Sequence, residues 1–411
     1  MSVLQIAPYM TSNDVPLLSQ CKAGFGYMVY DIAKSLALDV EVDALLNNYR
    51  YREFESDGIR FRPASFGLFL KNLFKCSSPV LMFHLWRKYH MQLRTFIRLV
   101  YAWIMSGYYY DVIKKGHYDI LHIHGCGFYD ELWMDICHRL NQKFIITLHG
   151  LNSFSDSVKL EQAGKRYERD FLKRVVEGEF PITVISSGIK NMIMNDYHVK
   201  DCDNIKVVCN AFSFSEKRTE IIDIRKQYNI PTEASIILYV GNLCQRKNQK
   251  QIINAFSLLP ASLKSNTFIL FMGKDLEKNY HMEEYVKSSE WKERFVLCGN
   301  IDKEIVPNFY EQANGVVLLS ISEGFGLSLI EGMHFGLPCM TFCDLDAFVD
   351  IYDKRAVVGL ADRNDQTVAN GMIKLLTTKW DKEKIKKYSK KFESEQMANN
   401  YLSVFKQIIR G

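Results

Sequence analysis

The sequence predicts an α/β protein built from two doubly wound, Rossmann-like domains. Short apolar runs alternate with helical segments along the whole chain, a pattern typical of parallel sheets covered by helices. A polar stretch at 213–234 separates two such series, and 411 residues exceed what a single core usually supports. We therefore expect domains at 1–210 and 211–394 that face a cleft, with a C-terminal helix at about 395–411 packing back on the first domain.

The strands of each domain are expected where apolar runs are bounded by turn-forming residues. In the first domain these runs lie at 2–8, 38–43, 119–123, 144–148, 182–186 and 205–209. In the second domain they lie at 235–240, 267–272, 294–298, 315–319, 337–342 and 356–359. The segment 379–411 is instead charged and helical, and one apolar stripe runs along it, formed by Tyr401, Leu402, Phe405 and Ile408.

Composition argues against several classes of protein. A hydrophobic content of 47% is that of an ordinary globular protein, and no apolar run approaches the roughly 20 residues of a membrane span. The ten cysteines are scattered without a C-x-x-C motif, so they indicate neither a zinc site nor a disulfide framework. Residues 1–18 lack the basic start of a signal peptide. We expect a cytoplasmic protein, soluble or peripheral at the inner face of the membrane.

The segment 58–110 is basic and rich in aromatic residues. It contains no Asp or Glu, and its positive residues are Arg60, Arg62, Lys71, Lys75, Arg87, Lys88, Arg94 and Arg98. Arg87, Arg94 and Arg98 have a helical spacing that predicts one shared face. Surfaces of this kind lie on anionic membranes; a core helix with a solvated basic edge is the structural alternative. Nucleic-acid binding is disfavoured, because no nucleic-acid-binding motif accompanies this one segment.

The segment 322–333 places two carboxylates, Glu323 and Glu331, around a glycine loop. An apolar strand precedes the loop and a helical apolar pattern follows it. Backbone amides at such a helix N-terminus favour a phosphate or diphosphate, whereas carboxylates suit the hydroxyl groups of sugars. If 327–331 is helical, the carboxylates are about 10 Å apart by the helical rise. That separation disfavours a retaining hydrolase, whose pair lies at about 5 Å.

Taken together, the motifs resemble glycosyltransferase family 4 of the GT-B fold. The resemblance covers nearly the whole chain and is strong over 235–380, where it runs through Val240-Gly241-Asn242-Leu243, Lys247-Asn248, Gly273, Leu297-Cys298-Gly299-Asn300 and Glu323 to Pro338. In the first half, Ala23-Gly24-Phe25-Gly26 resembles the family's glycine loop and Ile146-Thr147-Leu148-His149-Gly150 its strand ending in histidine.

The resemblance implies an activity and its substrates. Family members move a sugar from a nucleotide-diphosphate sugar to an acceptor, retain the anomeric configuration and use no metal. We therefore expect a retaining, metal-independent glycosyltransferase, most simply a hexosyltransferase, with a UDP- or GDP-linked donor. The expected acceptor is a glycan or a lipid-linked glycan of cell-surface polysaccharide biosynthesis, such as lipopolysaccharide or capsule. No cofactor is expected.

The resemblance also implies roles for individual residues. Catalytic candidates are Glu323, on hydroxyls of the donor sugar, Lys247, on the diphosphate, and His149, donating to a sugar or phosphate oxygen. Glu331 would meet the ribose. Asn242 stands where the family usually has an arginine, and whether Arg246 compensates is left open. The full set of donor-binding candidates is Gly24, Gly26, Gly241, Asn242, Arg246, Asn300, Ile301, Gly324, Phe325, Gly326, Leu327 and Glu331.

Several alternatives stay open at the level of sequence. His122, His124 and Cys126 alternate on one strand, but no fourth metal ligand has supporting spacing, so we interpret them as packing residues or cleft lining. The Asp-x-Asp tripeptides at 201–203 and 344–346 match a short metal-binding pattern that arises often by chance. A nucleotide-sugar epimerase of related fold and a non-catalytic nucleotide-sugar-binding protein are the competing functions.

Overall fold

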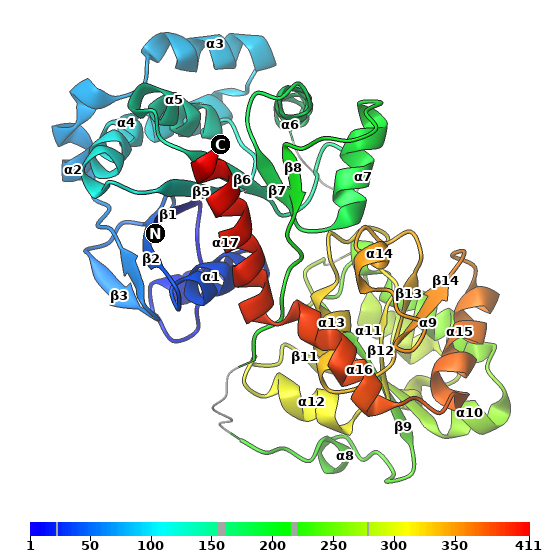
Figure 1. Ribbon diagram of the computed structural model, residues 1–411. Coiled ribbons are helices and arrows are strands. Elements are labelled where there is room, and N and C mark those ends of the chain that lie inside the picture. Colours follow the sequence, from blue (N-terminus) through cyan, green and yellow to red (C-terminus); the bar gives the residue numbers. More distant parts are fainter. Residues whose placement is uncertain (22–23, 155–160, 215–219, 278) are drawn as a thin grey trace. The chain divides into compact units, whose positions relative to one another are not determined.

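The computed structural model describes residues 1–21, 24–154, 161–214, 220–277 and 279–411. Contacts divide the chain into two compact units. Unit 1 contains Met1–Ile185, Ile189–Cys209 and Ser394–Gly411, and unit 2 contains Ser186–Gly188 and Asn210–Glu393. Each unit has one sheet with helices on its faces (Figure 1). The prediction of two Rossmann-like α/β domains is thereby confirmed.

The sheet of unit 1 has the order β3-β4-β2-β1-β5-β6-β7-β8. Its parallel strands include β1 (Ser2–Ala7), β2 (Glu41–Leu46), β5 (Ile120–His124), β6 (Phe144–Leu148), β7 (Ile182–Val184) and β8 (Ile205–Val207). The second strand begins at Glu41, later than the predicted 38–43. Every strand predicted for this half is present.

A short hairpin, β3 (Phe54–Ser56) and β4 (Ile59–Phe61), was not predicted. It extends the sheet, with β4 parallel to β2 and β3 antiparallel to β4. Asp57 and Gly58 form its turn with φ of 50° and 74°, as expected of an Asp-Gly hairpin turn. Strands this short carry little periodicity, so the Asp-Gly pair was the one usable signal.

Helices cover both faces of the first sheet. On one face α1 (Gly24–Leu36) and α17 (Ser394–Arg410) lie side by side (Figure 1). Tyr401 and Phe405 of α17 contact the ring of His122, with centroids 5.0 and 5.2 Å away. The opposite face carries α4 (Leu93–Gly116) and α5 (Asp130–Leu140), because right-handed crossovers before and after a reversal of strand order place helices on opposite faces. The remaining helices of more than one turn are α2 (Phe66–Lys71), α3 (Pro79–Tyr89), α6 (Gln162–Val176) and α7 (Ser187–Asp196).

The sheet of unit 2 is entirely parallel, in the order β11-β10-β9-β12-β13-β14. Its strands are β9 (Ser235–Val240), β10 (Thr267–Met272), β11 (Phe295–Gly299), β12 (Gly315–Leu318), β13 (Cys339–Phe342) and β14 (Val357–Leu360). All were predicted. This order is the doubly wound arrangement of dinucleotide-binding folds.

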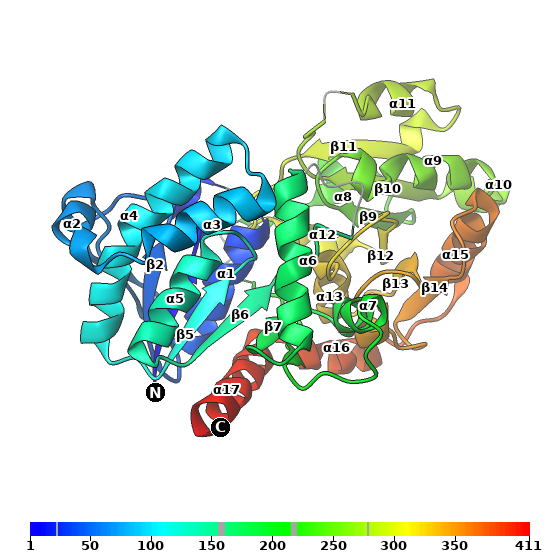
Figure 2. The ribbon, with the colours of Figure 1, turned by 90° about the horizontal axis from the view of Figure 1, so that it is seen from above.

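The helices of unit 2 also form two layers (Figure 2). One face carries α13 (Leu327–His334) and α16 (Lys382–Ser389), and the other carries α9 (Gln249–Ser257) and α15 (Asp365–Thr377). Shorter helices connect the strands: α8 (Ile224–Gln227), α10 (Ala261–Ser265), α11 (Met282–Ser288), α12 (Val306–Gln312) and α14 (Phe348–Ile351).

Strand order reverses between β1 and β5 in unit 1 and between β9 and β12 in unit 2. Loops leaving the carboxyl ends of strands diverge at such a reversal, and open α/β sheets bind their ligands there. Each unit therefore has a defined place at which to look for a site.

The basic segment 58–110 differs from its prediction in one respect. Arg87 lies on α3, whereas Arg94 and Arg98 lie on α4, and between them the chain turns at His90, whose φ is 51°. The prediction of one helical face is therefore wrong, because a left-handed residue ends α3. Within the described ranges, no helix has both the length and the apolar character needed to cross a membrane.

Candidate active site

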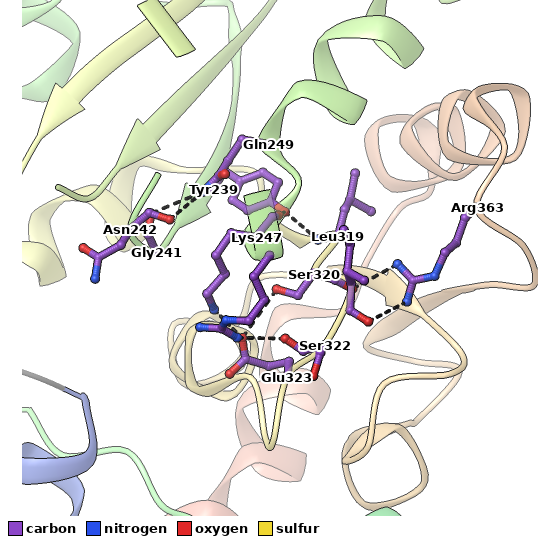
Figure 3. Close-up of polar contacts among 12 residues, drawn as sticks. Tyr239, Gly241, Asn242, Lys247, Gln249, Leu319, Ser320, Ser322, Glu323 and Arg363 are labelled. Carbon is purple, nitrogen blue, oxygen red and sulfur yellow. Dashed lines mark hydrogen bonds and ion pairs between the residues drawn. The ribbon is translucent and has the colours of Figure 1, made fainter. Parts of the chain in front are cut away.

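The loops that follow β9 and β12 are tied together by a buried tyrosine (Figure 3). The hydroxyl of Tyr239 donates to the carbonyl of Lys247 and accepts from the amide of Leu319 at 2.8 Å. A backbone bond from the amide of Ile321 to the carbonyl of Arg246 (2.8 Å) adds a second link. The sequence places these loops far apart, and the reversal in strand order makes them neighbours.

Two cations and one carboxylate meet where these loops touch. The ammonium of Lys247 contacts Oε2 of Glu323, and Nη1 of Arg246 lies 3.3 Å from the same oxygen. Arg246 also donates to the carbonyl of Ser322 at 2.8 Å. Lys247 and Glu323 are 13% and 17% exposed, against 39% for Arg246. Burial raises the pKa of Glu323, but the two positive charges outweigh it and hold that pKa below its usual range.

The two oxygens of Glu323 differ in their surroundings. Lys247, Arg246 and the hydroxyl of Ser320 (3.4 Å) all approach Oε2. Oε1 has no hydrogen-bond partner within the part of the chain that the structure describes. One oxygen is thus used to hold the loop, and the other can accept a hydrogen bond from a ligand.

The predicted sequence of strand, tight loop and helix is present in β12 and α13. Gly326 stands before α13 with φ of 86°, and a Cβ there would lie 3.0 Å from the side chain of Leu318. The first amides of α13, from Leu327 on, have no acceptor within the helix. Phe325 is buried against Phe392, so this residue can offer a ligand its backbone but not its side chain.

Asn242 is engaged by the protein itself. Its Oδ1 accepts from the amide of Lys274 at 3.1 Å, and its carbonyl accepts from the amide group of Gln249 at 2.9 Å. Gly241, with φ of 149°, lies so close to Lys247 that a Cβ would be 3.3 Å from Cε. Asn242 therefore joins the loops after β9 and β10, and Arg246 is the nearby arginine that reaches the charged cluster.

Glu331 is held by Tyr310, whose hydroxyl donates to Oε2 at 2.6 Å. Tyr310 is fully buried, and burial, followed by the charge of Glu331, raises its pKa, so the hydroxyl remains a donor. Asn300 and Ile301 follow β11, which β10 and β9 separate from β12. Asn300 is exposed and Ile301 partly so.

In unit 1, His149 follows β6 and lies against another histidine. Nε2 of His149 is 3.1 Å from Nδ1 of His124 on β5, and Nε2 of His124 contacts Oε1 of Gln5 on β1. Burial lowers the pKa of His149 to about 4 and that of His122 to about 3. These rings are therefore neutral near pH 7. The described residues contain no cluster of His, Cys, Asp or Glu able to hold a metal ion.

The two glycines of the first half have different surroundings. Gly24 is the first residue of α1, exposed and with open space around it. Gly26 lies inside the helix, where a Cβ would be 2.1 Å from Oγ1 of Thr11. The prediction of a glycine loop at this point is wrong, since both residues belong to α1. The close approach of residues 9–11, which leaves no room for a Cβ, is sufficient to explain why residue 26 is a glycine.

Sequence reasoning missed the residues that hold the charged loop in place. Arg363 donates to the carbonyl of Ser320 at 3.1 Å (Figure 3). It also donates to Oδ1 of Asp344 (2.8 Å), and its guanidinium stacks over Phe342 at 4.2 Å. Asp344, from one Asp-x-Asp tripeptide, is thereby committed to an ion pair. Tyr239 and Arg363 gave no signal, because one resembles any apolar strand residue and the other any surface arginine.

Two family models match most of the chain. The model described as "Glycosyltransferase Family 4" matches residues 23–215, and "Glycosyl transferases group 1" matches residues 220–392. The chain belongs to glycosyltransferase family 4. It is a glycosyltransferase of the GT-B type, as the resemblance implied.

Curated relatives of this family 4 chain are distant. An uncharacterized glycosyltransferase of Methanocaldococcus jannaschii is 22% identical over 72% of this chain and 77% of its own length. The 2-deoxystreptamine N-acetyl-D-glucosaminyltransferase of Niallia circulans is 22% identical, with 74% and 80% covered. The O-antigen chain mannosyltransferase B of Escherichia coli is 23% identical over 52% of this chain, which spans about half (55%) of that relative.

Solved structures match the family 4 chain along its full length. A glycosyltransferase from Rickettsia africae has a TM-score of 0.71 at 16% identity, covering 100% of this chain and 99% of that one. The HepE protein of Anabaena, in complex with UDP and glucose, has a TM-score of 0.64 at 13% identity, with 99% and 100% covered. At these identities the match establishes the GT-B fold.

Proposed function

We propose that this enzyme is a retaining, metal-independent transferase that uses a UDP- or GDP-linked sugar, most simply a hexose, as donor. The cluster of Lys247, Arg246 and Glu323 beside the start of α13 carries the proposal. Such a site offers two fixed cations and free backbone amides to a diphosphate, and carboxylate oxygens to hydroxyl groups. HepE, crystallised with UDP and glucose, supports this class of donor.

In the proposed complex, each group has its own part of the donor. The amides of Gly324–Leu327, with Lys247 and Arg246, bind the diphosphate. Glu323 accepts from a sugar hydroxyl through Oε1, and Glu331, oriented by Tyr310, accepts from the ribose. Cations in a partly buried site stabilise a leaving diphosphate directly, which is the task a metal ion performs in other transferases.

The proposed reaction is a front-face displacement. The bond between the anomeric carbon and the diphosphate oxygen breaks, and the acceptor oxygen forms its bond on the same face, so the configuration is retained. The electron pair of the broken bond stays with the diphosphate, which also takes the proton of the acceptor hydroxyl. Lys247, Arg246 and the α13 amides stabilise the charge that develops on the diphosphate.

The proposal is tested by transfer assays after a thermal-shift screen of nucleotide sugars. Glu323→Ala and Lys247→Ala are expected to abolish transfer without unfolding the protein, while EDTA has no effect. Lys250→Ala is the matched control, since its ammonium stacks on Tyr280 and Tyr285 at 4.9 and 4.8 Å. Near-normal turnover in either active-site variant contradicts the scheme, and conversion of donor without an acceptor indicates an epimerase.

We also propose a lipid-linked glycan of cell-surface polysaccharide biosynthesis as acceptor, used at the cytoplasmic face of a membrane. Large apolar residues of α2–α4 and the segments between them face solvent, among them Phe74, Val80, Leu93 and Ile97. Arg87, Arg94 and Arg98 are exposed beside them and have no ion pair among the described residues. Lys75 and Lys88 are instead paired with Asp111 and Asp170. Each unpaired base near anionic headgroups contributes on the order of 1 kcal/mol.

Liposome flotation tests this surface. The protein is expected to float with anionic vesicles and to remain in the bottom fraction with neutral ones. Combined substitution of Arg87, Arg94 and Arg98 by Gln is expected to abolish flotation. The control replaces three exposed lysines of unit 2, Lys226, Lys374 and Lys379, by Gln, which matches the change in net charge. Equal flotation of both triple variants contradicts a role for the α3–α4 surface.

A further inference from the structure

A ladder of polar side chains crosses the sheet of unit 1 beneath His149. Gln5 of β1, His122 and His124 of β5, and Thr147 of β6 are all buried. Strand register aligns Gln5 with His122 and His124 with Thr147. His149 follows Thr147 by two residues, the spacing that returns a side chain to the same face of a strand. The ladder leads from the sheet interior to a histidine that is partly exposed.

The hydrogen bonds of this ladder determine which nitrogens carry protons. Oε1 of Gln5 is only an acceptor, so Nε2 of His124, which contacts it, must carry the hydrogen. A neutral imidazole has one N–H, which leaves Nδ1 of His124 as an acceptor. The 3.1 Å contact with Nε2 of His149 then requires the hydrogen on that atom. Nδ1 of His149 is consequently the bare nitrogen.

The orientation of the Gln5 amide is supported by its neighbour. Nε2 of Gln5 and Nδ1 of His122 are both buried without a partner, yet the two residues are register partners on β1 and β5. If Nε2 of His122 donates to Oγ1 of Thr147 (2.6 Å), its Nδ1 is an acceptor that complements the amide donor of Gln5.

We propose that Gln5 and His124 are positioning residues that hold His149 in the Nε2–H tautomer, so that its Nδ1 accepts a hydrogen bond from a sugar hydroxyl. This reverses the expectation that His149 donates to a sugar or phosphate oxygen, because its one N–H is used on His124, and its sugar contact rests on the proposed function. Phe25 packs edge-on against the His149 ring at 4.9 Å and limits its rotation. Glu168 fixes the loop that follows, accepting from the amide and hydroxyl of Ser153 at 2.6 Å.

Nitrogen-15 NMR of histidine-labelled protein at pH 7.5 tests the tautomer without any substrate. His149→Gln identifies the His149 signals among those of the ten histidines. We expect a one-bond coupling to hydrogen at Nε2 of His149 and none at Nδ1. A coupling at Nδ1 overturns the proposal.

Two variants test the positioning role. Gln5→Met and His124→Phe keep approximate volume but remove the hydrogen bonds, and we expect the two nitrogen signals of His149 to move toward averaged positions. Gln5→Met remains informative if His124→Phe does not fold. Thr183→Val is the control, because its hydroxyl contacts Thr147 in the same buried layer. Unchanged His149 signals in Gln5→Met overturn the proposal.

Donor binding separates this proposal from the proposed function. UDP-glucose and GDP-mannose serve as probes in thermal-shift and transfer assays of wild type and His149→Gln. A lower affinity in His149→Gln supports the hydroxyl contact. If the tautomer is as expected but His149→Gln binds and transfers normally, the contact with sugar is overturned. If the wild type transfers no sugar from either probe while the tautomer is as expected, only the proposed function is contradicted.

Discussion

The ammonium of Lys247 and the carboxylate of Glu323 form an ion pair between loops whose residues are 76 positions apart in the sequence. The pair lies at the reversal of strand order between β9 and β12. Both side chains are mostly buried, so each depends on the other for compensation of its charge. The same contact therefore shapes the loop and, in the proposed function, prepares the donor site.

Lys247→Met is expected to lower the free energy of unfolding by roughly 3 kcal/mol at pH 7.5, because a mostly buried carboxylate keeps only Arg246 as its cation. Burial raises the pKa of Glu323, but the two cations lower it by more, so the net pKa is below the ordinary carboxyl value. The ionised Glu323 therefore stabilises the fold above the ordinary carboxyl pKa, and this stabilisation is lost as pH falls. The difference from wild type should shrink toward pH 4. Urea titrations at both pH values measure it, and a pH-independent difference argues against the ion pair.

Tyr239→Phe is expected to reduce kcat/KM and to lower the free energy of unfolding by about 1–2 kcal/mol, since the buried amide of Leu319 loses its acceptor. The fold should remain, because only a hydroxyl is removed. Tyr280→Phe is the control: its hydroxyl accepts from the amide of Lys250 at 3.2 Å, away from the Leu319 loop. Equal kinetic losses in the two variants would mean that Tyr239 has no special role.

Tyr310→Phe is expected to weaken nucleotide binding about tenfold, because Glu331 loses the donor that orients it and a hydrogen bond to a charged group is worth about 1.5–3 kcal/mol. Isothermal titration with UDP and GDP measures the change. Tyr285→Phe, which loses a hydroxyl contact with Asn254, controls for removal of a tyrosine oxygen. Full affinity in Tyr310→Phe would separate Glu331 from nucleotide binding.

Asp346→Asn is expected to raise the melting temperature at pH 8 and to have a smaller effect at pH 5. Burial, then the charges of Glu323 and Asp344, raises the pKa of Asp346 to about 6. A raised carboxyl pKa means that stability is present below the ordinary value and is lost as pH rises through 6. Thermal unfolding at the two pH values measures this, with the exposed Asp203→Asn as control. A lower melting temperature at pH 8 would show that the Asp346 charge is stabilising.

The hydrophobic pattern of the sequence was sufficient to predict the long strands of both sheets. Long apolar strands such as Ser235–Val240 and Thr267–Met272 are buried along their length, so their sequence alone identifies them. The hairpin at Phe54–Phe61 was not predicted, because its strands are too short to show a period. The shared face predicted for Arg87, Arg94 and Arg98 was wrong because the chain turns at His90, and a left-handed histidine has no reliable signature in a single sequence.

The sequence by itself determined the α/β class, the strands of both sheets apart from the β3–β4 hairpin, and the glycine-containing turn before α13. These follow from local burial patterns and from the backbone freedom of glycine. Only the tertiary structure decided that Lys247 and Arg246 meet one oxygen of Glu323, and that His149 contacts His124, which in turn contacts Gln5. Such contacts join residues on different strands and loops, and their geometry depends on strand order and side-chain rotamers, which no local pattern encodes.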